Sequence, residues 1–422
     1  MGLSGTPLSP KCVATTVSAD GSVLSGSSTS GPSEGSGKDG DEKSGFSNYT
    51  KDVEWSPDGT FVVTNSADNH IRTFILPPDL LDERSTPHRL EPYSVIPSKE
   101  PVYSTALYPY CSLQDPSTTI ILASVRDHPI RLNSALSPHL LASYSLICPS
   151  TEAFITPYSM LYPSTLGGTH FLTGSDSLIC LFDVSRSGKD GPVSRLPTIP
   201  SKRKKIVGGG VGMKGIVSAL SISSDGSGIL AAGTFTRHVG LYGSNGSGDC
   251  IATFSVAGTE AQSHIGGGGV TQVLWSPCGR YLYVIERKSD GVLVYDIRVT
   301  GQLVGWLEGR KAETNQRLKA DVVATGEEGT HELWAGGTDG SMRVWKDPPS
   351  SIDGKCPDFE WSIHGDPVTS TVVHPMGSVV ATSSGQKTFP DLSEPDEGGD
   401  SEGLAGPTPG KHVDNTLKVW AL

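Results

Sequence analysis

Several features that would place this chain in a common functional class are scarce or missing. Only 18% of its 422 residues are charged, against about 25% in an average domain. No apolar run approaches the roughly 18 residues that a membrane-spanning helix needs, and the amino terminus has no basic stretch followed by an apolar one. The sequence therefore predicts neither a membrane protein nor a secreted one.

Paired cysteines and catalytic motifs are also missing. The 7 cysteines form no CxxC pair, and isolated thiols without metal or disulfide spacing are typical of a reducing compartment. No HExxH helix, nucleophile elbow or cluster of metal ligands occurs. The segment GGGVGMKG at 208–215 has Gly-x-Gly-x-x-Gly spacing, but no strand-to-helix unit surrounds it. We therefore expect no enzyme, cofactor, metal or small-molecule substrate.

Glycine and proline are abundant instead. The chain has 51 glycines and 30 prolines, which indicates many tight turns between short elements and favours an all-β protein. The formal net charge of -12 argues against a chain that holds nucleic acid by its total positive potential. A local basic face is compatible with that total.

The amino-terminal residues differ in composition from the remainder. Residues 1–45 are dominated by Ser, Gly and Thr, with too little apolar mass to offset the entropy of ordering. We predict a disordered tail over 1–45 and a folded region over 46–422. Two flexible insertions are expected within the folded region, at about 196–214 and 385–413.

The folded region repeats one pattern seven times. Each copy has an alternating apolar run, a polar turn and a second alternating run that often ends in an aromatic residue. The second runs are IRTF from Ile71, IRLN from Ile130, ICLF from Ile179, VGLY from Val239, VLVY from Val292, MRVW from Met342 and LKVW from Leu417. Four turns carry an aspartate, namely Asp68, Asp127, Asp176 and Asp339. Seven such units predict a seven-bladed β-propeller.

Two copies begin with almost the same residues. VEWSPDGTF starts at Val53 and VLWSPCGRY at Val273, and each indicates a strand, a tight turn and a second strand. The pattern resembles the WD-repeat family, with His264 in that family's histidine position. To leave no open edge, the last blade should take its outer strand from the residues just before Lys51.

The strand order predicts where basic residues gather. In a four-stranded blade, the hairpins between the second and third strands share one face with the connections between blades, and we call this the rim face. The residues expected there are Arg126, His128, Lys202, Arg203, Lys204, Lys205, Arg237, His238, Arg287, Lys288, Arg310, Lys311 and Arg317. We interpret them as a surface for a phosphate backbone.

Two other interpretations of this basic set stay open. The residues can be ordinary solvated loop residues, and the KRKK segment at 202–205 can be a nuclear-import patch. The acidic segment 391–402 is expected on the same face, where it would compete with RNA or screen the basic residues.

Further segments resemble one family more closely. WSPDGTFVVTNSADNHIRTFILPPDL is followed by PVYSTALYP, ASVRDHPIRL, TNQR at 314–317 and ATSSGQKTFP, and an acidic insertion precedes LKVW. In this order, from about Tyr49 to Leu422, they resemble the telomerase Cajal body protein family. The resemblance implies a seven-bladed scaffold that binds small guide RNAs through a short loop element and delivers them to nuclear Cajal bodies. In animals such proteins join the telomerase ribonucleoprotein, and fungal counterparts are linked to pre-mRNA splicing.

Sequence and resemblance together predict a non-enzymatic nuclear scaffold, with the cytoplasm left open as a second location. Its expected partners are small Cajal body RNAs or telomerase RNA, together with ribonucleoprotein or splicing proteins, and we expect a monomer. The alternative function is a protein-only adaptor associated with pre-mRNA splicing factors. Salt separates the two functions, because phosphate contacts weaken steeply as salt rises.

Overall fold

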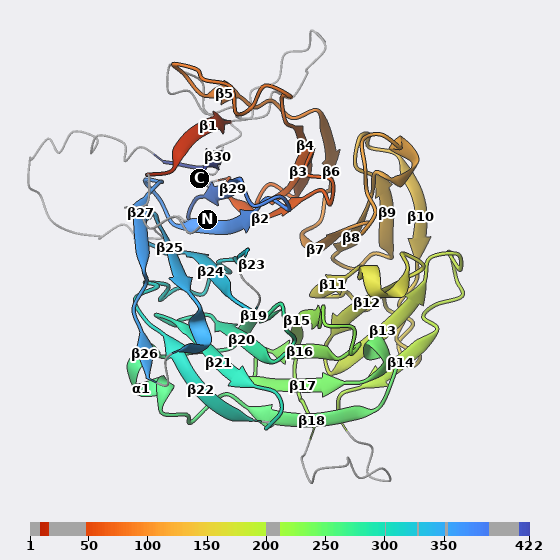
Figure 1. Ribbon diagram of the computed structural model, residues 1–422. Coiled ribbons are helices and arrows are strands. Elements are labelled where there is room, and N and C mark those ends of the chain that lie inside the picture. Colours follow the sequence, from red (N-terminus) through yellow and green to blue (C-terminus); the bar gives the residue numbers. More distant parts are fainter. Residues whose placement is uncertain are drawn as a thin grey trace, which may run out of the picture.

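A computed structural model describes residues 9–16, 48–199, 212–299, 301–326, 329–350, 353–387 and 413–422. Seven sheets of mostly four antiparallel strands stand around a central axis, as Figure 1 shows. The prediction of an all-β, seven-bladed WD-repeat β-propeller is confirmed. No helix in these ranges is long and apolar enough to cross a membrane.

Each blade contributes one strand to each of four concentric layers. The innermost strands are β2 (Thr50–Trp55), β7 (Val102–Leu107), β11 (Ser159–Leu161), β15 (Val217–Ile222), β19 (Val270–Trp275), β23 (Ala320–Ala324) and β28 (Val368–Val373). The second strands are β3 (Phe61–Ser66), β8 (Ile120–Val125), β12 (His170–Ser175), β16 (Leu230–Thr234), β20 (Tyr281–Glu286), β24 (His331–Gly336) and β29 (Val379–Ser384).

The third strands contain the seven second runs of the repeat. They are β4 (His70–Ile75), β9 (Ile130–Ser134), β13 (Leu178–Asp183), β17 (His238–Tyr242), β21 (Val292–Asp296), β25 (Ser341–Lys346) and β30 (Leu417–Ala421). The outer strands are β6 (Ser94–Pro97), β10 (Leu140–Tyr144), β14 (Ser194–Pro197), β18 (Cys250–Ser255), β22 (Gln302–Leu307), β27 (Phe359–Ser362) and β1 (Lys11–Thr15). Two short strands, β5 (His88–Arg89) and β26 (Gly354–Lys355), add parallel to β1 and β22, and α1 (Ala261–Ile265) precedes β19.

The repeated Ser-Pro-x-Gly turns join first and second strands on the face opposite the rim face. Asp58 Oδ1 accepts hydrogen bonds from the Ser56 hydroxyl at 2.7 Å and from the Thr60 backbone N–H at 3.1 Å. Gly59 takes the left-handed φ of 70° that closes the turn. In the second copy Cys278 replaces the aspartate, with its Sγ 3.3 Å from Ser276 Oγ.

The tryptophan before each turn fastens its blade to the preceding one. Trp55 Nε1 donates to the Val372 carbonyl at 3.0 Å, and Trp275 Nε1 donates to the Ser221 carbonyl at 3.1 Å. Both rings are buried, so each satisfies its only polar atom while covering apolar surface between two sheets. The repeated sequence is therefore a blade-to-blade joint.

The closing strand is not where the sequence predicted it. β1 pairs antiparallel with β30, and its Val13 and Ala14 are buried in the core of the last blade. The expectation that residues just before Lys51 close the ring is wrong, because Thr50 and Lys51 already begin the innermost strand of the first blade. The expectation of a disordered tail over 1–45 is likewise wrong at Lys11–Thr15. Five residues acquire their order from a partner strand rather than from their composition.

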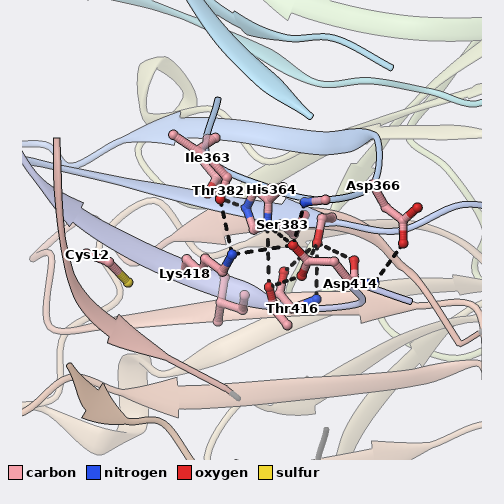
Figure 2. Close-up of polar contacts among 12 residues, drawn as sticks. Cys12, Ile363, His364, Asp366, Thr382, Ser383, Asp414, Thr416 and Lys418 are labelled. Carbon is pink, nitrogen blue, oxygen red and sulfur yellow. Dashed lines mark hydrogen bonds and ion pairs between the residues drawn. The ribbon is translucent and has the colours of Figure 1, made fainter. Parts of the chain in front are cut away.

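A buried polar network joins both ends of the acidic insertion to the last blade, as Figure 2 shows. Trp420 Nε1 donates to Thr382 Oγ1 at 2.8 Å, and His364 Nε2 lies 2.8 Å from the same oxygen. The Asp414 carboxylate can only accept, so His364 Nδ1 donates to Asp414 Oδ2 at 3.2 Å, and Nε2 of the neutral ring accepts the Thr382 hydroxyl proton. The Ser384 hydroxyl, just before the insertion, also donates to Asp414, just after it.

His264, which the WD-repeat pattern puts in the histidine position, makes other contacts than His364. His264 lies in α1 and stacks on Trp306, with ring centroids 4.8 Å apart. Both histidines lie in connections between blades, His264 between β18 and β19 and His364 between β27 and β28.

Candidate nucleic-acid interface

All the predicted site residues that the structure describes come from the loops of the rim face. Arg126 and His128 lie between β8 and β9, and Arg237 and His238 lie at the turn from β16 to β17. Arg287 and Lys288 follow β20, whereas Arg310, Lys311 and Arg317 lie between β22 and β23. Lys202, Arg203, Lys204 and Lys205, like the acidic segment 391–402, lie outside the described residues. The topology was thus predicted, and the side-chain environments decide what each residue can do.

Three of the predicted cations are already paired with carboxylates. Arg126 Nη2 lies 2.8 Å from Glu100 Oε2. Arg237 Nε lies 2.7 Å from Glu286 Oε1, and this arginine also donates to Gln262. Lys311 Nζ lies 3.2 Å from Asp339 Oδ2. Arg237 in particular is largely buried in its ion pair and has a structural role, which corrects its assignment as a phosphate contact.

The predicted role of Arg310 as a phosphate contact is wrong, because only 1% of its surface is exposed. Its Nη2 donates to the Leu318 carbonyl at 2.6 Å. Burial, together with the nearby Arg343 charge, lowers the pKa of Arg310 to about 10. It therefore supports the connection between two blades from inside and cannot touch a phosphate.

The two predicted histidines shape their hairpins. His128 Nδ1 lies 2.7 Å from the Arg126 carbonyl, and His238 Nδ1 lies 2.8 Å from the Thr236 carbonyl. In both cases the ring contacts the carbonyl two positions earlier and closes a turn around the intervening residue, Asp127 or Arg237, which has positive φ. These contacts give each histidine a local structural role.

Arg287 and Arg317 differ from the paired cations, because they share one aromatic ring. The Cζ of Arg287 lies 4.8 Å from the centroid of Phe235, and that of Arg317 lies 5.5 Å from it. Within the described ranges neither guanidinium forms an ion pair with a carboxylate. We call Phe235, Arg287 and Arg317 the mouth cluster.

Phe235 and Arg317 of the mouth cluster line a cavity of about 800 Å³. Its walls come from the first residues of innermost strands and from rim-face loops, so it lies at the end of the central channel that faces the rim. The lining includes Tyr49, Lys51, Asp52, Asn65, Tyr103, Tyr158, Phe235, Thr271, Gln272, Gln316, Arg317 and Lys319. Its size is in the range of sites that bind small molecules.

A repeated β-bulge supplies part of this lining. The pairing register with the second strand skips one residue near the start of five innermost strands, and the skipped residues are Lys51, Tyr103, Ser218, Thr271 and Thr369. Bulges re-aim side chains beside functional sites. Tyr158, immediately before β11, stacks on Tyr103 with ring centroids 4.9 Å apart.

The cavity retains positive charge within a chain of net charge -12. Lys319 Nζ pairs with Asp52 at 2.8 Å, which neutralises that carboxylate. Burial lowers the pKa of Lys51 to about 8, so this amine is still mostly charged at neutral pH. Deeper in the channel, burial raises the pKa of Glu54 to about 7, which removes part of its negative charge. The carboxylate that acts on Arg317, Asp52, is thus shared with Lys319.

The aromatic lining was not predicted from the sequence, because Tyr103, Tyr158 and Phe235 lie at strand ends rather than in long polar loops. One signal was present. In PVYSTALYP and TPYSML a tyrosine stands just ahead of the alternating run of an innermost strand, where other blades have a small or polar residue. At this end of a strand few apolar side chains are available for an aromatic ring to pack against, so a tyrosine there indicates a channel lining rather than a core position.

Comparison with known proteins places the chain among WD-repeat proteins. Residues 44–74 match the family model described as WD domain, G-beta repeat. Telomerase Cajal body protein 1 of Homo sapiens is 28% identical over 380 residues, which cover 88% of this chain and 64% of that protein.

Two fungal proteins are also similar. Guanine nucleotide-binding protein negative regulator 1 of Schizosaccharomyces pombe is 32% identical over 305 residues, or 71% of each chain. Protein SWT21 of Candida glabrata is 29% identical over 278 residues, which cover 64% of this chain and 61% of that protein. The chain thus spans less than two thirds of the human protein but a larger share of the S. pombe protein.

Proposed function

Because the chain belongs to the family of WD-repeat proteins that includes telomerase Cajal body protein 1 and its fungal counterparts, we propose that it is a nuclear, non-enzymatic scaffold that binds RNA. The proposed ligands are small guide RNAs, either small Cajal body RNAs or telomerase RNA. The proposed role is to direct the localisation or assembly of a ribonucleoprotein in the nucleus, at Cajal bodies.

One observation carries the proposal: the rim face gathers guanidinium groups without carboxylate partners around an aromatic ring. Arg287 and Arg317 contact Phe235 and form no ion pair in the described parts of the chain. A cation that already has a carboxylate, such as Arg126, would have to exchange it for a phosphate. A guanidinium whose charge is not balanced can accept phosphate oxygens without that loss.

Lys288 extends this surface outward. Its backbone N–H donates to the Thr314 carbonyl at 2.8 Å, which fixes the hairpin against the connection that carries Arg317. Its side chain is exposed, and its φ of 52° turns the chain at the tip. The Lys288 ammonium group can therefore attract a phosphate from solvent without first breaking an ion pair within the protein.

The experiment is charge reversal with an RNA readout. Lys288→Glu should weaken salt-dependent binding of single-stranded RNA by the purified full chain and reduce RNA crosslinking in cells, while thermal unfolding is unchanged. Arg186→Glu is the matched control, because Arg186 lies between β13 and β14 on the opposite face in an exposed pair with Asp190. Equal loss in both variants would mean that only total charge matters.

Immunoprecipitation followed by RNA sequencing then separates RNA binding from protein-only binding. Under our proposal, small guide RNAs are enriched, and Lys288→Glu depletes them. Enrichment of proteins alone, unchanged by RNase and by salt, would support the adaptor associated with splicing factors and overturn the RNA scaffold.

A further inference from the structure

We propose that the cavity at the channel mouth captures one unpaired nucleotide of the bound RNA, with its phosphate on Arg317 and Arg287 and its base against the aromatic lining. This inference rests on the proposed function and names the site at which that function selects single-stranded RNA.

The phosphate subsite follows from the electrostatics of Arg317. Among the described residues its guanidinium has no hydrogen-bond acceptor, and its recorded contact is with the Phe235 ring. Burial lowers the pKa of Arg317, the Asp52 charge offsets part of that, and the nearby Arg287 charge lowers it again. Two guanidinium groups on one ring repel each other until an anion joins them, and a phosphate offers oxygens to both.

The base subsite follows from the aromatic residues in the same cavity. Tyr103 and Tyr158 are stacked with an interplanar angle of 30°, and Phe235 lies in the wall of the next blade. Unpaired bases bind proteins by stacking on aromatic rings and guanidinium planes, and paired bases cannot. The combination of planar rings and unbalanced cations in one cavity favours a nucleotide over an aliphatic ligand or a purely anionic one.

Asn65 supplies an independent sign that the cavity receives a polar ligand. It is 4% exposed and lines the cavity, and its Oδ1 has no hydrogen-bond partner in the described parts of the chain. Its Nδ2 makes one long contact, 3.5 Å, to the Val102 carbonyl. A buried acceptor without a donor is unfavourable. A ribose 2′-hydroxyl or a base amino group can supply that donor.

The cavity excludes a base-paired segment by its construction. Its walls are innermost strands of a closed ring, held together by bonds such as the one that the Met160 backbone N–H donates to Ser104 Oγ at 3.1 Å. A duplex presents its bases stacked inside two phosphate backbones, so it can rest on the rim but cannot insert a base. The site therefore distinguishes single strands and loops from duplex stems.

The test measures binding of three probes by the purified full chain: a short single-stranded RNA, a blunt RNA duplex of equal length and adenosine 5′-monophosphate. Arg317→Gln and Phe235→Leu should each weaken single-strand binding about tenfold, as expected for one charge-assisted contact or one stacked base. Arg317→Gln should also lower the slope of log affinity against log salt by about 0.7. Duplex binding should be unchanged in both variants.

Two variants guard against a folding artefact. Phe235→Tyr keeps the ring and should restore binding, whereas a variant that merely disturbs the hairpin would not be rescued. Arg186→Gln removes an exposed guanidinium from the opposite face and should bind like the wild type.

The outcomes separate this site from the proposed function. Single-stranded RNA bound equally well by the wild type, Arg317→Gln and Phe235→Leu would overturn the cavity site and leave the scaffold standing. Mononucleotide binding that Arg317→Gln abolishes, without any RNA binding, would keep the nucleotide pocket and overturn the scaffold. Failure of all three probes to bind would overturn the nucleotide assignment.

Discussion

The Asp414 carboxylate offers a sharp test of how the last blade is held together. It is 8% exposed and accepts hydrogen bonds from the Gly365 backbone N–H at 2.8 Å, the Thr416 hydroxyl at 2.6 Å and the Ser384 hydroxyl at 3.0 Å. His364 Nδ1 and Lys418 Nζ complete the set at 3.2 and 3.4 Å. We predict that Asp414→Asn lowers the free energy of unfolding by about 3–5 kcal/mol at pH 7.5. That is the usual cost of removing one partner of a buried ionic network.

The pH dependence of the loss identifies its cause. Burial acts to raise the pKa of Asp414, but the donors around it, His364 first, hold that pKa well below its ordinary value of 3.8. A carboxylate whose pKa is depressed on folding contributes stability that is fully present above its unfolded pKa and is lost as the pH falls below it. The difference between wild type and Asp414→Asn should therefore be constant from pH 8 to about 5 and shrink below about 4.

Urea unfolding followed by tryptophan fluorescence at a series of pH values measures this difference, since Trp420 belongs to the network. Burial also lowers the pKa of His364, so absolute stability should fall as the pH drops through about 6.5. The comparison is therefore made between variants at each pH. Asp190→Asn, which disturbs an exposed pair, should cost less than about 1 kcal/mol. A loss below about 1 kcal/mol in Asp414→Asn, or a difference that persists undiminished at pH 3.5, would refute this account.

Two further predictions concern the chain terminus and the cysteines. Deleting residues 1–16 removes β1 and should destabilise the fold by at least about 2 kcal/mol, the value of burying one valine, because Val13 is buried and the edge of β30 loses its partner. Deleting residues 1–8 leaves β1 complete and is the control. Equal melting temperatures of the two truncated proteins would contradict ring closure by β1. Hydrogen bonds from Ser150 and Thr151 lower the pKa of Cys148 to about 6, whereas burial raises the pKa of Cys180 to about 12. At pH 7, Cys148 should therefore react with iodoacetamide far faster than Cys180, as peptide mass spectrometry can measure. A reaction rate of Cys148 that rises only above pH 8 would contradict this.

The propeller was predictable because its signals are local. Alternating runs such as VVATSS and LKVW encode strands over a few residues, and turn residues such as Pro57 and Gly59 separate them. β1 was not predictable in this way. Its five residues, KCVAT, lie within a Ser- and Gly-rich region, and their order depends on pairing with a strand some four hundred positions away.

The interface was predicted only at the level of the face. Topology assigns Arg237 and Arg287 to adjacent positions on the rim, yet one is buried in an ion pair with Glu286 and the other lies on Phe235. Partners so distant in sequence cannot be read from local patterns. The bulges that direct Lys51 and Tyr103 toward the channel are equally invisible, since a register shift depends on the neighbouring strand.

The same pairing bears on how an acidic chain could hold the proposed RNA site. The net charge of -12 is a sum over the whole molecule, but fields in physiological salt decay over about 8 Å. Within that distance of the mouth cluster, Asp52 is compensated by Lys319 and Glu286 by Arg237. In each pair the carboxylate is already balanced by a cation, so it does not repel a phosphate at the mouth cluster. The paired cation in turn adds no free positive charge to the rim face. In the proposed site the charge of Arg317 lies at the channel mouth beside the aromatic rings, where charge and stacking would act on the same nucleotide.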